Sequence, residues 1–297
     1  MIKNLAITPP IIGRISIGRV VEKNGKRLPE KDDQFTLTTQ IQTRDGWRLH
    51  PLDEALRQEA NGGKLRAIPV RMLFDDPDLN LRAEYTLFDR KTGRPLCVGD
   101  GETCRRQTEE GLQSLPCPSP DTCPLAQGGA CKPYGRLSVR MGDDDDVGVF
   151  VFRTTGFNSI RTLAARLRYY HALSGGLLAT LPLALRLRGK STTQSHRSPI
   201  YYVDLTVRDD TTLDAAIADA QTLAQTRRER GLDQTALDDA ARLAFGNSDF
   251  DFTEEEGLHI VEEFVPNTES EMASTTKDST PAASPLSQKL ARCQQSS

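Results

Sequence analysis

The sequence of 297 residues lacks long apolar runs. No stretch approaches the roughly 20 apolar residues that a helix needs to cross a bilayer, so no membrane segment is expected. The N-terminal residues Met1-Ile-Lys-Asn-Leu-Ala-Ile-Thr-Pro-Pro also lack the charged region, apolar run and small-residue cleavage site of a secretory signal. We therefore expect a cytoplasmic protein, in which cysteines bind metal more often than they form disulfides.

Catalytic signatures are missing as well. The sequence contains neither H-E-x-x-H nor G-x-S-x-G, and its four histidines stand at no ligand spacing from one another. Gly189-Lys190-Ser191 resembles the end of a phosphate-binding loop, but the glycine that such a loop needs five residues earlier is Ala184 here. The sequence therefore predicts no catalytic residues and no nucleotide cofactor.

What the sequence does contain is a cluster of cysteines. Five of its six cysteines fall within 35 residues: Cys97, Cys104, Cys117, Cys123 and Cys131. The segment around them is rich in glycine and proline and poor in apolar residues, so it cannot build a hydrophobic core of its own. A Zn²⁺ ion held by four thiolates would supply the missing cross-links. Free structural thiols, redox pairs and disulfides are the alternatives.

The spacing selects no known zinc class, since it is not the doubled C-x₂-C of a zinc ribbon. The predicted ligands are Cys104, Cys117, Cys123 and Cys131. Cys97 is the alternate ligand, because it follows a predicted strand and turn at 81–93 and has a packing role there. A site with four sulfur ligands leaves no open position for water, so the zinc would be structural.

Apolar and polar residues alternate in the first half of the chain, which indicates strands, and the second half has helical periodicity. The predicted strands are 13–20, 35–41, 67–74, 81–88, 135–141, 147–153, 181–188 and 198–208, and the predicted helices are 51–60, 158–174, 212–230 and 234–245, with Asn158 as an N-cap. The four carboxylates 143–146 fall at a hairpin tip and indicate a solvated turn. The fold class is therefore α+β, mainly an antiparallel sheet with a cysteine-rich zinc-binding insertion at 97–135 and C-terminal helices.

The chain divides by charge. From Asn247 onward there are ten acidic and three basic residues, whereas the remainder has 31 acidic and 35 basic residues. We predict a single α+β domain at 1–246 and an acidic, low-complexity tail at 247–297, with 265–297 disordered. The apolar residues of the tail either form a short docking segment or belong to a solubilising tail without a partner; they are Phe250, Phe252, Ile260, Val261 and Phe264.

Seven basic residues come from three successive predicted elements: Arg153, Arg161, Arg168, Arg186, Arg188, Lys190 and Arg197. Arginine forks match phosphate oxygens, and the same surface would suit an acidic protein. These residues are the predicted site for a nucleic acid or a protein partner. The alternative is that they only solvate the exposed faces of a helix and a hairpin.

Several stretches resemble the recombination-directionality-factor-like proteins of phages and integrative mobile elements, which are often labelled only "hydrolase or metal-binding". The stretches are Ile12-Gly-Arg-Ile-Ser-Ile-Gly, Lys26-Arg-Leu-Pro-Glu-Lys-Asp-Asp-Gln-Phe, Ala67-Ile-Pro-Val-Arg-Met-Leu-Phe-Asp-Asp, the cysteine segment through Cys131-Lys-Pro-Tyr-Gly-Arg-Leu, and Phe150-Val-Phe-Arg-Thr-Thr-Gly-Phe-Asn-Ser-Ile-Arg-Thr-Leu. The resemblance covers about residues 10 to 245.

The resemblance implies a protein without chemistry of its own. A directionality factor binds a serine integrase, repositions the coiled-coil arm of the integrase and converts integration into excision. We therefore expect a zinc-stabilised binding protein of a mobile element, whose partner is a serine integrase or another recombination protein. Direct contact with DNA is left open, and within the same class of binding proteins a replication accessory protein that handles single-stranded DNA is also considered. The alternative is a metal-dependent hydrolase or nuclease that uses Asp100, Glu102 and distant carboxylates.

Overall fold

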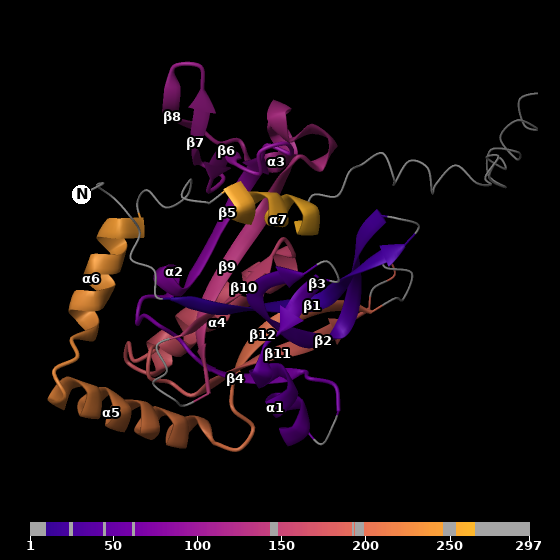
Figure 1. The fold of residues 1–297 in the computed structure, drawn as a ribbon. Helices are drawn as coiled ribbons and strands as arrows, with labels where there is room; N and C mark the ends of the chain where they lie inside the picture. The colour runs from indigo at the N-terminus through magenta and orange to yellow at the C-terminus, as the bar shows by residue number, and fades with distance from the viewer. Residues whose placement is uncertain are drawn as a thin grey trace, which may run out of the picture. The chain divides into compact units, whose positions relative to one another are not determined.

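A computed structural model describes residues 10–23, 26–43, 46–60, 63–142, 148–191, 193, 199–245 and 254–264 of the chain. A long sheet dominates these residues (Figure 1). Its main path runs in the order β3 (Gly46–Leu49), β2 (Lys26–Thr43), β1 (Ile11–Lys23), β10 (Val149–Thr154), β9 (Cys131–Met141), β5 (Leu81–Phe88), β6 (Pro95–Gly99), β7 (Thr103–Thr108) and β8 (Gly111–Pro116). The α+β prediction with a mainly antiparallel sheet is confirmed.

Two features break the simple antiparallel path. β1 pairs with β10 in parallel, with Ile11 opposite Val149. β4 (Ala67–Arg71) pairs with β9 and also with β11 (Leu183–Lys190), which in turn pairs with β12 (Ile200–Val207). The strands near the N-terminus and those near residue 200 therefore share one core.

The four longest of the described helices lie in the second half of the chain. The described helices are α1 (Pro51–Glu59), α2 (Pro77–Asn80), α3 (Ser119–Thr122), the 3₁₀ segment η1 (Pro124–Gly129), α4 (Phe157–Leu173), α5 (Leu213–Glu229), α6 (Gln234–Phe245) and α7 (Glu254–Phe264). None of the helices in the described residues is long and apolar enough to cross a membrane.

The core follows from the alternation of side chains along the strands. Leu183 and Leu185 of β11 are fully buried, and they share the core with Phe150 and Phe152 of β10 and with Leu163 of α4. Each such side chain stabilises the fold by roughly 1.5 to 3 kcal/mol through burial. The sequence pattern of this strand, with alternate leucines turned into the core, is confirmed by the burial of Leu183, Leu185 and Leu187. The strand begins at Leu183 and not at 181 as predicted.

The predicted cap of the long helix is wrong. The N-cap of α4 is Gly156, and Asn158 already lies in the first turn, where its side chain accepts a hydrogen bond from Lys190 Nζ at 2.9 Å. Asn158 therefore ties the helix to the end of β11 instead of capping it.

The cysteine-rich segment extends the sheet. Residues 95–130, called the cysteine arm from here on, contain β6, β7 and β8 paired as successive antiparallel strands, followed by α3 and η1. Gly111, with φ of 106°, makes the tight turn between β7 and β8. Few apolar side chains of this arm are buried, namely Pro95, Cys97, Val98, Cys104 and Ala126. The arm thus has backbone pairing but hardly any core.

The compact unit of the chain reaches Phe264, beyond the domain boundary predicted at 246. Helix α7 belongs to it, with Ile260 fully buried and Val261 nearly so. Of the predicted docking segment, Ile260, Val261 and Phe264 lie in this helix, whereas Phe250 and Phe252 lie outside the described residues. The predicted hairpin tip at 143–146 and the predicted disordered segment 265–297 lie outside the described residues.

Candidate metal centre and charged surfaces

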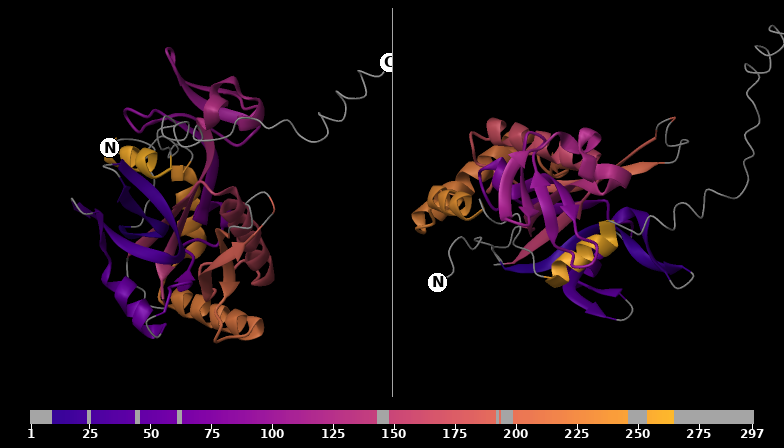
Figure 2. Two further views of the ribbon diagram at one scale, coloured as in Figure 1. Left: turned by 90° about the vertical axis from the view of Figure 1, so that its right-hand side faces the viewer. Right: turned by 90° about the horizontal axis from the view of Figure 1, so that it is seen from above.

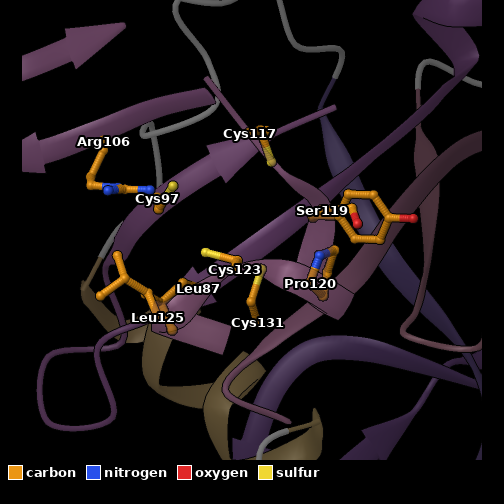
Figure 3. A pocket seen from close by; sticks show the side chains of 11 residues that line it. Leu87, Cys97, Arg106, Cys117, Ser119, Pro120, Cys123, Leu125 and Cys131 are labelled. Carbon is orange, nitrogen blue, oxygen red and sulfur yellow. The ribbon is translucent and has the colours of Figure 1, made fainter. Parts of the chain in front are cut away.

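Four cysteines from separate elements surround one small pocket (Figure 3). Cys97 lies in β6, Cys117 follows β8, Cys123 follows α3, and Cys131 begins β9. The cavity between them has a volume of about 10 Å³. That volume is roughly what one water molecule needs, so the pocket has room for a single atom or ion and not for an organic substrate.

Cys104 is not among the residues that line this pocket. It lies in β7 opposite Gly99, is 3% exposed, and its Sγ points to the carbonyl oxygen of Pro116 at 3.7 Å. The absence of a side chain at Gly99 makes this packing possible, because a Cβ there would lie 2.7 Å from the Cβ of Cys104 and 3.0 Å from Sγ of Cys117. The pocket thus brings together three of the four predicted ligands and the alternate, Cys97.

All five described cysteines are free thiols. Burial, the hydrogen bond with Cys97 and the nearby thiols raise the pKa of Cys104 to about 11. Burial raises the pKa of Cys131 to about 12, together with the charges of the other four thiols. A side-chain hydrogen bond with Cys97 raises the pKa of Arg106, which lines the same pocket. The cluster therefore resists carrying several thiolates at once unless a further cation joins it.

The side chains as placed do not form a ready-made ligand set. Among the described residues, no group of three or more His, Cys, Asp or Glu side chains is arranged so that it could hold a metal ion. What supports a metal centre is instead the pocket that the four cysteines share.

One carboxylate considered for a hydrolytic site, Asp100, has structural partners. Asp100 accepts hydrogen bonds from the backbone N–H groups of Glu102 and Thr103 at 2.8 and 2.7 Å, and these bonds lower its pKa. The Asp100 side chain thus closes the turn between β6 and β7.

A second, larger cavity of about 450 Å³ lies between α2 and α6 and is lined by Asp75, Asp76, Asp238 and His171, among others. The carboxylates there also bind local groups. Asp238 Oδ2 accepts from the N–H groups of Asp75 and Asp76 at 3.0 Å, and Asp76 Oδ2 pairs with Arg242 at 2.9 Å. These groups join the two helices.

The seven basic residues predicted as a binding surface do not form one cationic patch. Arg188 pairs with Asp204 at 3.0 Å, Arg168 pairs with Asp78 at 3.2 Å, and Arg186 pairs with Asp209. Lys190 binds Asn158, Arg161 is exposed, and Arg197 lies outside the described residues. Because much of the positive charge is balanced locally, this surface is a weaker candidate for phosphate binding than the sequence indicates.

Arg153 lies elsewhere, on the opposite face of the sheet. Phe150 and Phe152 point into the core, so alternation turns Arg153 to the other side. The strand register places it beside Arg136 of β9, which is opposite Arg82 of β5. Arg14 of β1, opposite Val151, shares this face. We call these four residues, Arg14, Arg153, Arg136 and Arg82, the arginine row.

Of this row, only Arg153 was among the predicted binding residues, although the sequence carries a signal for the others. Arg14 alternates with the core residue Ile15, and Arg153 with Phe152. Such alternation normally indicates a solvated face, yet burial lowers the pKa of Arg14 and of Arg136. The arginine row is therefore a partly buried cationic surface.

Helix α7 covers part of the arginine row, next to β1, β3 and β9 (Figure 2). Glu263 pairs with Arg14 at 2.6 Å, and the ring of His259 meets the ring of Trp47 edge-on at 4.9 Å. The Arg14 guanidinium in turn stacks over Trp47 at 4.2 Å. Burial raises the pKa of Glu263 against the opposing charges of Arg14 and Arg153.

The sequence matches the profile of one protein family, Gp3-like, described as recombination directionality factor-like, over residues 12–208. This range is about two thirds of the chain and runs from β1 through β12, so it includes the cysteine arm and the whole arginine row. It ends before α5, α6 and α7. No curated protein matches, and no solved structure matches.

Proposed function

The chain belongs to the Gp3-like, recombination directionality factor-like family, and from this membership we propose that it is a non-catalytic accessory protein of DNA recombination. It acts by binding a recombinase, a serine integrase in the simplest case, and by changing the outcome that the recombinase favours. The observation that carries the proposal is the family match over 12–208, which takes in every described strand.

Two features of the chain support a binding role. The cysteine pocket has room for about one atom, and the carboxylates of Asp100, Asp76 and Asp238 are engaged with backbone groups or with an arginine. The cysteine arm also exposes Leu112 and Leu125, which are 42% and 46% exposed. Exposed apolar side chains on a polar arm are typical of a surface that a partner covers.

We further propose a structural Zn²⁺ ion bound by Cys97, Cys117, Cys123 and Cys131. The donor set fits, because four thiolates are the ligands of closed zinc sites and the pocket admits one ion. Each cysteine has a single side-chain torsion, so a rotamer change can bring its sulfur inward. The ion would join β6, the segment after β8, the end of α3 and the start of β9, and it would stabilise an arm that has almost no core.

The accessory role is tested with the recombinase of the same mobile element and its attachment sites. Addition of the full-length protein is expected to shift the products from integration toward excision, and the protein is expected to co-migrate with the recombinase in gel filtration. Leu112→Asp serves as the matched variant, since this side chain is 42% exposed and does not line the cysteine pocket, so the fold should persist. Absence of both binding and any change in products would overturn the proposal.

A further inference from the structure

The outer face of helix α4 differs from the other surfaces that carry basic residues. One side of the helix packs into the core through Ile160, Leu163 and Leu167. The opposite side has exposed residues at three- and four-residue steps, which the helical period brings onto one face. These residues are Phe157, Arg161, Ala165, Arg168 and Ala172, with Tyr169 beside them, and we call the six of them the α4 stripe.

Two aromatic rings of the α4 stripe are turned to solvent. Phe157 is 55% exposed, and Tyr169 is 52% exposed. The ring of Tyr169 meets that of Tyr170 edge-on at 5.4 Å between centroids, so a neighbour on the same helix supports it. The distance along the helix between Phe157 and Tyr169 is about 18 Å. An exposed ring of this kind offers a flat apolar face on which another ring can stack.

The α4 stripe is also cationic. Helix α4 contains three arginines and neither Asp nor Glu, whereas α5, α6 and α7 each contain at least two acidic residues. Arg161 is exposed and forms no ion pair within the part of the chain that the structure describes. Arg168 pairs with Asp78, but the two side chains are 69% and 77% exposed. So exposed a pair is weak, and a phosphate can take the place of the carboxylate.

The positive charge next to the α4 stripe exceeds the acidic charge that opposes it. Arg166 of α4 and Arg188 of β11 share one carboxylate, that of the buried Asp204, at 3.1 and 3.0 Å. Lys190 binds the neutral amide of Asn158 near the start of α4. These groups need not touch a ligand, because uncompensated charge attracts a polyanion through the field of the whole surface.

Rings and arginines are interleaved along the helix, since Phe157 is followed by Arg161, and Arg168 by Tyr169. A guanidinium group suits phosphate oxygens, and an aromatic ring stacks on the face of a base. In a duplex the neighbouring base pairs cover these faces, so only a single strand can use both kinds of side chain. An acidic peptide would pair with the arginines but would leave the rings without a flat partner.

From these observations we propose that the α4 stripe binds single-stranded nucleic acid without reading its sequence. Phe157 and Tyr169 stack on bases, and Arg161 and Arg168 contact phosphates. The inference goes beyond the proposed recombinase binding and does not depend on it. Of the seven basic residues predicted as a binding surface, it assigns a contact to Arg161 and Arg168 and none to the arginines of β11.

The stacking contacts are tested with the full-length protein and a labelled single-stranded oligonucleotide of about 20 nucleotides, which exceeds the roughly 4 to 16 that comparable surfaces cover. Phe157→Ala and Tyr169→Ala should each weaken binding at least about fivefold, because each removes the partner of one stacked base. Leu243→Ala is the matched control, since Leu243 is 83% exposed on α6. It should bind as the wild type does.

The phosphate contacts are tested through the salt dependence of the same binding. Arg161→Gln should lower the affinity and reduce the slope of log affinity against log salt by about 0.7, as expected for the loss of one phosphate contact to a single strand. Arg228→Gln, at an exposed position of α5, is the matched control and should change neither quantity. Circular dichroism should be the same for all these variants, because every substituted side chain is exposed.

Four results would overturn the inference. One is no binding of the oligonucleotide even at low salt. A second is an equal effect of Arg161→Gln and Arg228→Gln, which would reduce the attraction to general charge. A duplex that binds as tightly as the single strand would show that the bases are not stacked. Polyglutamate that binds as tightly would make this a surface for an acidic protein. Because no recombinase is present, these outcomes stay distinct from a failure of the accessory role in the recombination assay.

Discussion

The cysteine pocket and the arginine row lie on opposite faces of the same two strands, β5 and β9. Leu87 and Cys131 face each other across the strand pair and line the pocket, whereas Arg82 and Arg136 face each other on the other side. One face gathers thiols, which can ionise together only around a cation. The other gathers guanidinium groups and meets the carboxylate of Glu263. Strand alternation thus places a site that requires a cation and a site that pairs with an anion on opposite faces of the same two strands.

The two faces also differ in how a region with little apolar packing is stabilised. The cysteine arm would depend on a bound ion, which is outside the chain, while the arginine row depends on a helix of the chain itself. Removal of the ion should therefore affect the arm alone, and release of α7 should affect the other face alone.

The largest expected effect follows from removal of a thiol ligand. Cys123→Ser should reduce zinc from about one per chain to none and abolish hydrogen-exchange protection in residues 95–130, because the arm has almost no core to replace the ion. Metal analysis measures the zinc content, and hydrogen exchange measures the protection of the arm.

Cys104→Ser is the control for the ligand set, since Cys104 is close to the pocket but does not line it. This variant should retain zinc, and Cys97→Ser should lose it. The opposite pattern would restore Cys104 as a ligand in place of Cys97. Full retention of zinc by Cys123→Ser would contradict the metal centre.

A smaller but still large effect is expected on the opposite face. Arg14→Glu places two carboxylates together where Arg14 and Glu263 are 11% and 23% exposed, and the loss of a buried partner costs about 3 to 5 kcal/mol. Denaturant unfolding should show this loss, and the emission of Trp47 should shift to longer wavelength. Zinc content should not change. Loss of zinc in this variant would show that the two faces are coupled.

A third test concerns the arginines of β11, which we expect to stabilise the fold through ion pairs and not to bind a partner. Asp204 is buried and is paired with both Arg188 and Arg166. Arg188→Glu should therefore cost about 1 to 3 kcal/mol of unfolding free energy, as expected when a buried charged group loses a partner. Arg161→Glu, at an exposed position of α4, should cost much less. Equal costs would contradict this assignment.

The smallest effect on stability is expected for Asp33, whose ion pairs with Lys64 and Arg66 are at the surface. This variant shows how little a surface ion pair contributes compared with the buried ones. Hydrogen bonds from Lys64 and Arg66 lower the pKa of Asp33 from 3.8 to about 2. Because the folded pKa lies below the unfolded one, the contribution of Asp33 to stability is present above about pH 4 and is lost as the pH falls toward 2. Asp33→Asn should be slightly less stable than the wild type at neutral pH, and the two unfolding curves should converge in acid.

Much of the fold could be predicted from the sequence, because alternation and helical periodicity report burial directly. The strand 81–88, the helix 234–245 and the inward leucines of β11 are all present as predicted. Strands β6 to β8 were missed because they bury few apolar residues, so their sequence carries no strong period. The cap at Asn158 was wrong because a suitable residue type does not reveal where a helix begins.

The candidate site was less accessible to sequence reasoning. Spacing identified the cysteine cluster but could not choose between Cys97 and Cys104. The register places both on the same face of β6 and β7, and only the tertiary arrangement shows that Cys97 lines the pocket and Cys104 does not. The arginine row was hidden for a related reason. Arginines on alternate strand positions usually face water, and only the tertiary arrangement shows that α7 lies over them.

The parallel pairing of β1 with β10 has a consequence for folding during synthesis. Ile11 emerges from the ribosome more than a hundred residues before its neighbour Val149. Until β10 has been synthesised, the β1 edge of the β1–β2 hairpin has no strand to pair with. Pairing with so distant a segment is slow, and the open edge can meanwhile pair wrongly with another nascent chain. A chaperone that shields this edge during synthesis should therefore improve the yield of native protein more than one that acts after release.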